Sequence, residues 1–161
     1  MASFFVDYLE RLAMLHDEMD KALTGLPQTA LDWTLGPELN SLAVLAAHVA
    51  GSEMFWIGDV IIRQKSTRVR DHEFQTTAVT AEDLKTRLAQ ALADSRQAVA
   101  QLTLADLAEE RPSPHGDGAV YSVAWCLLHA LEHVAIHVGH MQLARQWWEE
   151  QQQNNTEGAG R

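Results

Sequence analysis

Four histidines recur three or four residues apart in one segment of the chain: His129, His133, His137 and His140. On an α-helix, positions with this spacing share one face, so the four imidazoles form a single stripe. Two imidazoles one turn apart can both ligate one divalent ion, at roughly 2.0–2.1 Å each. The alternative is a set of ordinary core or surface histidines. An apolar helix face has no other use for so many costly polar groups, so the spacing predicts a metal site.

Within the stripe, His133 and His137 are the predicted ligands, because they lie in the middle of the segment with apolar residues around them. His129 and His140 are predicted to orient the ligands from the second shell or simply to be buried. If His140 did ligate, it would complete the shell of the ion.

A third ligand is predicted at His48, from a different part of the chain. In a helix that begins after Ser41, His48 and Ser52 share one face, and Ser52 is a candidate to support the ligands. Taken alone, His48 would be read as a core histidine. The stripe on the last helix favours ligation, because metal sites in helix bundles draw ligands from facing helices. Glu53 falls off this face and is predicted to be solvated or paired with a neighbouring base.

Hydrophobic periodicity predicts four helices that would position these side chains. They cover residues 4–24, 42–64, 80–102 and 121–148. Thr80 with Asp83 three residues later resembles a capping box, and Ser122 can cap the last helix. Few Gly and Pro residues and no alternating Val/Ile/Thr runs argue against a sheet. The predicted fold is all-α, a four-helix bundle.

Three connections separate the helices, at residues 26–40, 65–79 and 103–120. Around the start of the second connection, the chain carries a basic cluster of Arg63, Lys65, Arg68 and Arg70. This cluster could meet an anionic substrate, although a solvated run of charges is the simpler interpretation. The third connection is predicted to be a plain connector, with a lid as the alternative. Residues 1–150 are predicted to form one domain and residues 151–161 a disordered polar tail.

Composition narrows the classes of partner. The chain has 161 residues, 47% of them hydrophobic, and a formal net charge of −10. Nucleic acid and acidic membrane surfaces bind clusters of Lys and Arg, so neither is an expected partner. The single Cys126 permits no internal disulfide, and we recognise neither a signal sequence nor a membrane-spanning run. We therefore expect a cytoplasmic protein.

Two motifs resemble the DinB/YfiT-like superfamily of small four-helix metal-binding proteins. Residues 40–51, Asn-Ser-Leu-Ala-Val-Leu-Ala-Ala-His-Val-Ala-Gly, resemble its second-helix motif, in which a capping Ser is followed seven residues later by a metal-binding His. Residues 129–140 resemble its last-helix motif, usually seen as His-x-x-x-His-Arg-Gly-Gln. The order and spacing of the helices match over nearly the whole chain. The resemblance places the family's His triad on His48, His133 and His137.

The chain departs from the usual motif at two positions. Val138 stands where Arg is common, so a role of that Arg in substrate binding or helix pairing does not transfer. His140 stands where Gln is common and could keep its hydrogen-bonding role. The family name refers to a damage-inducible relative and implies no DNA binding. Characterised relatives include S-transferases and isomerases that use low-molecular-weight thiols, and iron-binding domains of thiohistidine biosynthesis.

These observations favour a metal-dependent thiol S-transferase, or a related hydrolase or isomerase, acting on a small thiol or electrophile. Three neutral imidazoles leave an open position on a tetrahedral ion, which can bind a thiol and lower its pKa. A non-catalytic metal-binding or sensing module is the alternative, and a purely structural bundle ranks last. Zinc or nickel is the expected metal, while iron, manganese or copper would also accept this ligand set.

A homodimer is expected from the end of the last helix. Trp147 and Trp148 are adjacent and therefore face about 100° apart on a helix, so that one ring can pack inward while the other meets a partner chain. The resemblance points the same way, because members of the family pair through bundle faces.

Overall fold

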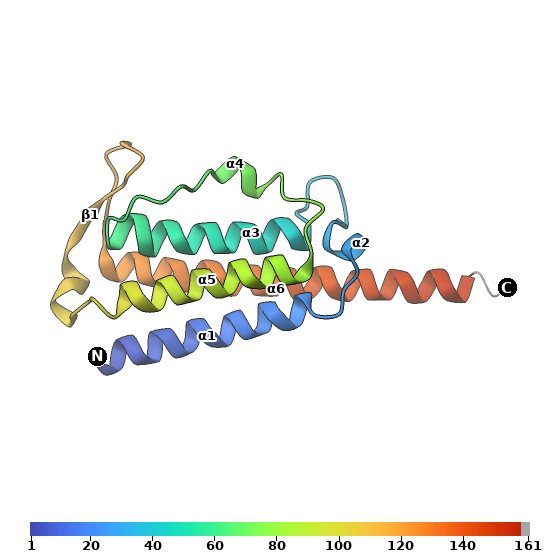
Figure 1. The fold of residues 1–161 in the computed structure, drawn as a ribbon, viewed down its shortest axis with the longest axis horizontal. Coiled ribbons are helices and arrows are strands. Elements are labelled where there is room, and N and C mark those ends of the chain that lie inside the picture. The colour runs from blue at the N-terminus through green and yellow to red at the C-terminus, as the bar shows by residue number, and fades with distance from the viewer. Residues whose placement is uncertain (159–161) are drawn as a thin grey trace.

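In the computed structural model, which describes residues 1–158, four long helices lie side by side as a bundle (Figure 1). The bundle consists of α1 (Ser3–Leu23), α3 (Leu42–Glu53) continued by the π-helix η1 (Met54–Ile61), α5 (Ala81–Val99) and α6 (Val123–Gly158). The predicted all-α bundle is confirmed, and three of the helices begin within a residue of their predicted start. Two short helices, α2 (Gln28–Leu31) and α4 (Arg70–Glu73), lie in the connections.

Side-chain caps fix where α3 and α5 begin. The hydroxyl of Ser41 accepts a hydrogen bond from the backbone N–H of Val44 at the start of α3. Thr80 and Asp83 form the reciprocal capping box predicted for α5. These bonds satisfy backbone N–H groups that have no partner within the helix.

The central helix is α3, which is buried on all sides. Eleven of its twelve residues are buried, and the exception is His48. The segment Leu42–Ile61 is long and apolar enough to cross a membrane, but 72% of its most apolar stretch is buried inside the bundle, as in the core helix of a soluble protein. The burial explains the apolar composition and leaves His48 as the helix's one partly accessible position.

The second helix ends three residues earlier than the predicted 64 and changes character after Glu53. In η1 the backbone bonds widen, as in the bond from Ile62 N–H to the carbonyl of Ile57, five residues back. Insertions of this kind frequently occur at functional sites. Arg63 follows with a φ of 58°, which turns the chain into the connection that carries α4.

The third connection is more ordered than predicted. It contains the 3₁₀-helix η2 (Leu104–Ala108) and a two-stranded antiparallel hairpin, β1 (Glu110–Pro112) with β2 (Val120–Ser122). Arg111 donates from Nε to the carbonyl of Ile61, which ties the hairpin to the end of η1. The hairpin lies at one end of the bundle (Figure 1).

At the opposite end, α6 projects beyond the other helices (Figure 1). It runs to Gly158, so residues 151–158 are helical in place of the predicted disordered tail. Gln and Glu are good helix formers and no Pro interrupts the segment, which explains the continuation. Residues 159–161 of the predicted tail lie outside the described residues. Trp148 packs against Trp33 of the first connection, with ring centroids 5.9 Å apart.

Candidate metal centre

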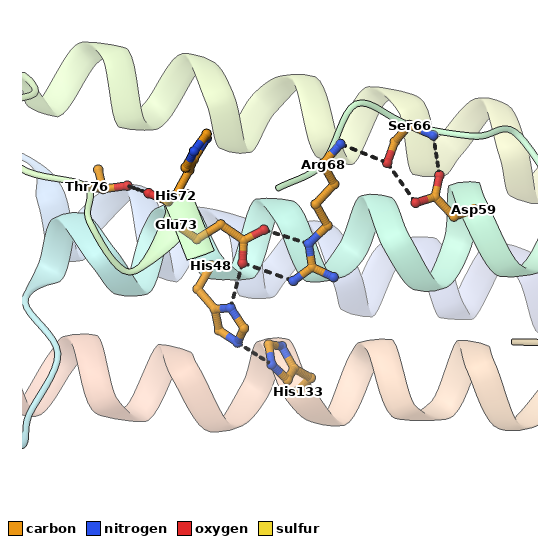
Figure 2. A network of polar contacts seen from close by, with 8 residues as sticks. All are labelled: His48, Asp59, Ser66, Arg68, His72, Glu73, Thr76 and His133. Atoms are coloured by element: carbon orange, nitrogen blue, oxygen red, sulfur yellow. Dashed lines mark hydrogen bonds and ion pairs between the residues drawn. The ribbon is translucent and has the colours of Figure 1, made fainter. Parts of the chain in front are cut away.

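The three predicted ligands converge between α3 and α6. His48 comes from α3, and His133 and His137 come from successive turns of α6; one ligand atom from each lies within 4.8 Å of the others. The Nε2 atoms of His48 and His133 are 3.1 Å apart (Figure 2). Within the described residues, no fourth His, Cys, Asp or Glu side chain joins this group.

The donor set fits a divalent metal ion. Two ligands at about 2.1 Å from a tetrahedral ion are about 3.4 Å apart, close to the separation of the two Nε2 atoms. Nδ1 of His133 is buried without a hydrogen-bond partner among the described residues. The facing Nε2 atoms of His48 and His133 are placed so that they can ligate one shared cation.

Two of the imidazoles are held neutral. Burial, and then the neighbouring His137 and His48, lowers the pKa of His133 to about 3. Burial, followed by His48 and His140, lowers the pKa of His137 to about 4. A neutral imidazole offers the lone pair that a metal ion requires. Both rings are therefore ready to ligate at neutral pH.

Glu73 supports His48 from outside the cluster. Its Oε2 lies 2.9 Å from Nδ1 of His48, while Arg68 donates to both carboxylate oxygens, at 2.6 and 3.0 Å (Figure 2). Burial raises the pKa of the Glu73 carboxyl, but the hydrogen bonds from Arg68 and His48 outweigh burial and leave the pKa below its usual value. An ionised Glu73 fixes the proton of His48 on Nδ1 and turns Nε2 toward α6.

Sequence reasoning missed Glu73 and Arg68 as parts of the site. Both come from the connection between η1 and α5, where the sequence indicates a loop with a solvated run of basic charges. Glu73 reaches His48 over Gly51, where a Cβ would overlap its carboxylate. A Gly one turn after a candidate ligand was the only signal in the sequence, and it does not reveal which side chain occupies the space.

The three candidate supporting residues lie in different surroundings. His140 is exposed on α6, with Nδ1 3.3 Å from Nδ1 of His137. His129 belongs to an aromatic cluster, stacked on Trp125 at 4.7 Å and edge-on to Trp56 at 4.7 Å. Ser52 is buried, and in the described part of the chain its side chain makes no hydrogen bond to the three ligands. Only His140 is placed to orient a ligand.

A largely apolar cavity of about 300 Å³ opens beside His137. Its walls come from α6, from Leu45 of α3 and from the connection before α3, and they include His140, Trp33, Leu35, Leu39 and Trp147. A cavity of this size next to the candidate metal position can hold part of a small molecule.

A second polar cluster lies inside the bundle. Glu53 is 1% exposed and pairs with His16 at 2.7 Å and with the hydroxyl of Ser95 at 2.6 Å. Of the two predicted alternatives for Glu53, the structure has the pairing with a base, and His16 is buried in the core. Burial and then the charge of Glu53 raise the pKa of the nearby Tyr8. These contacts join α1, α3 and α5 and are separate from the three-His group.

Comparison with solved structures shows the same fold in several proteins. The conserved protein from Enterococcus faecalis has a TM-score of 0.69 at 13% identity, covering 86% of this chain and 93% of that one. An uncharacterized protein from Clostridium difficile has a TM-score of 0.64 at 12% identity, covering 91% and 95%. The mycothiol-dependent maleylpyruvate isomerase has a TM-score of 0.61 at 14% identity. That alignment covers 83% of this chain but only 59% of the isomerase.

No curated protein matches the sequence. The family model of the mycothiol-S-transferases does, over residues 7–149, a range that contains all three histidines of the cluster. This match confirms the resemblance to DinB/YfiT-like proteins that the two histidine motifs carry. The chain belongs to the mycothiol-S-transferase family, a DinB/YfiT-like family of helix bundles.

Proposed function

We propose that the protein is a metal-dependent S-transferase, which joins a low-molecular-weight thiol to a small electrophile. The observation that carries this proposal is the group of three imidazoles without a fourth protein ligand in the described residues, beside an apolar cavity. Structural zinc sites normally fill all four positions with protein ligands, whereas catalytic sites keep one open. The family match supports the same class of reaction.

His48, His133 and His137 would hold the metal, with zinc or nickel as the expected ion. A divalent cation bound here would act as a Lewis acid. It would lower the pKa of a bound thiol, so that more of the thiol is present as the reactive thiolate. The protein's own part is to present three neutral imidazoles and to keep Nε2 of His48 aimed at α6 through Glu73. In the reaction, the thiol proton is released to solvent, the sulfur forms a bond to the electrophilic atom, and the bond from that atom to the leaving group, such as a halide, breaks so that the leaving group departs as an anion.

The reacting thiol is not the protein's own. Cys126 is completely buried, and burial raises its pKa to about 11. A thiol in this state is a poor nucleophile at neutral pH. The sulfur therefore comes from a small molecule, and the cavity beside His137 is the place for the group that carries it.

Metal analysis of the untagged protein tests the first half of the proposal, with one equivalent per chain expected. His48→Ala should lose this metal, while His72→Ala, which removes an exposed histidine from α4, should keep it. If His48→Ala keeps a full equivalent at unchanged affinity, the ligand assignment is wrong.

Thiol binding tests the second half. Mycothiol added to the cobalt-substituted protein should perturb its visible spectrum, and the loaded protein should then conjugate mycothiol to an aryl halide. A spectral change without conjugation of any electrophile would favour the alternative function, a metal-binding or sensing module. A spectrum indifferent to millimolar thiol would contradict an open site.

A further inference from the structure

A second cleft, of about 520 Å³, is lined by Phe55, seven residues after His48, whereas the apolar cavity is lined by Leu45, three residues before it. The cleft and the cavity therefore lie toward opposite ends of the α3–η1 helix from His48. The cleft is formed by η1, the chain that follows it and the tip of the hairpin between β1 and β2. Its charged lining residues are Asp59, Arg63, Lys65, Arg68 and Arg70. The basic cluster noted in the sequence is therefore gathered around one cavity.

The positive charge of this cleft is unusual for so acidic a chain. The protein has 12 Lys and Arg residues and a net charge of −10, yet four of its cations line this cavity. Arg63, Lys65 and Arg70 make no ion pair in the described part of the chain. The lone lining carboxylate, Asp59, accepts from the backbone N–H and the hydroxyl of Ser66, at 2.6 and 2.7 Å (Figure 2). Asp59 is therefore already engaged.

Backbone strain supports a functional role for this rim. Arg63 has a φ of 58°, in the left-handed region that glycine adopts at lower cost. Its side chain is exposed, so packing does not explain why an arginine occupies this position. A charged side chain kept where the backbone favours glycine is consistent with a requirement for its charge at the mouth of the cleft.

One wall of the cleft is aromatic. Phe55 stacks on His115 of the hairpin tip, with ring centroids 4.8 Å apart and planes inclined by 20°. The guanidinium of Arg68 lies 5.4 Å from the centroid of Phe55. A planar organic body can lie against such a wall while its anionic group meets the cations.

Arg68 joins this cleft to the histidine cluster, because it lines the cleft and also donates to Glu73, the partner of His48 (Figure 2). Phe55 follows His48 by seven residues in the continuous α3–η1 helix, which corresponds to about 10 Å along the axis. A small molecule anchored in the cleft can therefore extend to the cluster.

We propose that this cleft binds the carboxylate of the electrophilic substrate, and that the enzyme prefers anionic, planar electrophiles to neutral ones. That the bound anion is an electrophilic substrate rests on the proposed function, whereas the anion site itself is argued from its lining residues alone. In this arrangement the anionic electrophile lies on the Phe55 side of the histidine cluster, and the thiol approaches from the cavity beside His137.

A matched pair of electrophiles tests the assignment. 4-Chloro-3-nitrobenzoate and 4-chloro-3-nitrobenzamide share the reacting carbon and differ in one negative charge. Calorimetric titration of the metal-loaded full chain, without thiol, should show the benzoate binding about tenfold more tightly, which corresponds to about 1.4 kcal/mol. Raising the salt concentration should erode this preference, because exposed charges are screened.

Variants locate the effect. Arg63→Gln and Lys65→Gln should each weaken benzoate binding about three- to tenfold, leave benzamide binding unchanged and keep the metal. Arg87→Gln is the control, because it removes an equal charge from an exposed position of α5. Inorganic phosphate should compete only weakly, since it cannot use the aromatic wall.

Equal affinities for the two probes, or benzoate binding that is insensitive to both variants, would overturn the assignment. If phosphate bound as tightly as the benzoate, the proposal that the cleft selects an organic substrate would be overturned. Preferential benzoate binding without any conjugation would instead overturn the proposed transferase function and leave the anion site in place.

Discussion

Nδ1 of His48 lies 2.9 Å from Oε2 of Glu73, and this single contact decides which nitrogen of His48 faces α6. A carboxylate that accepts from one ring nitrogen leaves the other as the metal donor and raises its basicity. The contact is possible because α3 has no side chain at Gly51, where the Glu73 carboxylate rests against the helix. The orientation of His48 therefore depends on Glu73, which would not itself contact the metal.

We predict that Gly51→Ala weakens metal binding by about 10- to 100-fold, the usual effect of losing a side chain that hydrogen-bonds to a metal ligand. The new methyl group would overlap the carboxylate of Glu73 and push it away from His48. Gly58→Ala is the matched control, because a Cβ there meets nothing closer than 4.0 Å. Competition with a chromogenic chelator measures both affinities. Equal affinities in the two variants would contradict the role of Glu73.

The buried pair of His16 and Glu53 should control stability and not metal binding. We predict that Glu53→Ala lowers the free energy of unfolding by about 3–5 kcal/mol, because it leaves a cavity and strands two buried groups, His16 and Ser95. Urea unfolding of the metal-free protein measures the loss. Metal stoichiometry at low temperature should stay at the wild-type value. A metal-deficient variant of unchanged stability would place Glu53 in the site.

The helices and the pair of histidines on α6 could be predicted because both follow from the spacing of residues along the chain. His133 and His137 share a face through a four-residue interval, and His48 follows from the need for a ligand on a facing helix. Glu73 could not be predicted, because it reaches His48 from a connection 25 residues away. Periodicity carries no information on how such a connection folds back.

The same limit explains the differences in the connections. In the β1–β2 hairpin, Arg111 pairs with Tyr121 across a segment that contains Pro and Gly. The sequence indicates only a connector there. The sequence indicates a solvated run of basic residues, because it does not show which distant side chains lie beside them. In the structure they lie with Phe55 and His115 around one cleft. Long-range packing decided each of these cases.

Cys126 should be unreactive and dispensable for catalysis. Because burial raises its pKa to about 11, the native protein should resist iodoacetamide at pH 8 and react only after unfolding. Cys126→Ala should keep thiol conjugation at the wild-type rate, with a stability loss of about 1 kcal/mol from the lost core volume. Mass spectrometry after a timed exposure measures the labelling. Rapid native labelling together with an inactive alanine variant would make Cys126 a participant in the reaction.

The homodimer predicted from the adjacent tryptophans remains a prediction. Trp148 packs against Trp33, whereas Trp147 is 40% exposed. Light scattering at micromolar concentration should give twice the chain mass of 17.9 kDa, and Trp147→Ala should shift the population toward the monomer. Trp125→Ala, at an exposed tryptophan near the other end of α6, is the control. A monomer mass for the wild-type protein would end this prediction.

His140 decides whether the metal position is open. Its Nδ1 lies 3.3 Å from Nδ1 of His137, so it meets the ring nitrogen that is not needed for the metal if His137 ligates through Nε2. A third ligand from the same helix would also have to reach along the helix axis past His137. We therefore predict that His140 orients His137 and does not ligate.

His140→Ala should keep one equivalent of metal, with an affinity about tenfold lower, and His140→Gln should restore the affinity by supplying a hydrogen-bonding amide. Thiol should still perturb the cobalt spectrum of both variants, because the open position is untouched. Metal analysis and the cobalt titration give the two readouts. Complete loss of metal in His140→Ala, together with a wild-type spectrum indifferent to thiol, would mean that His140 is the fourth ligand and that the site is structural.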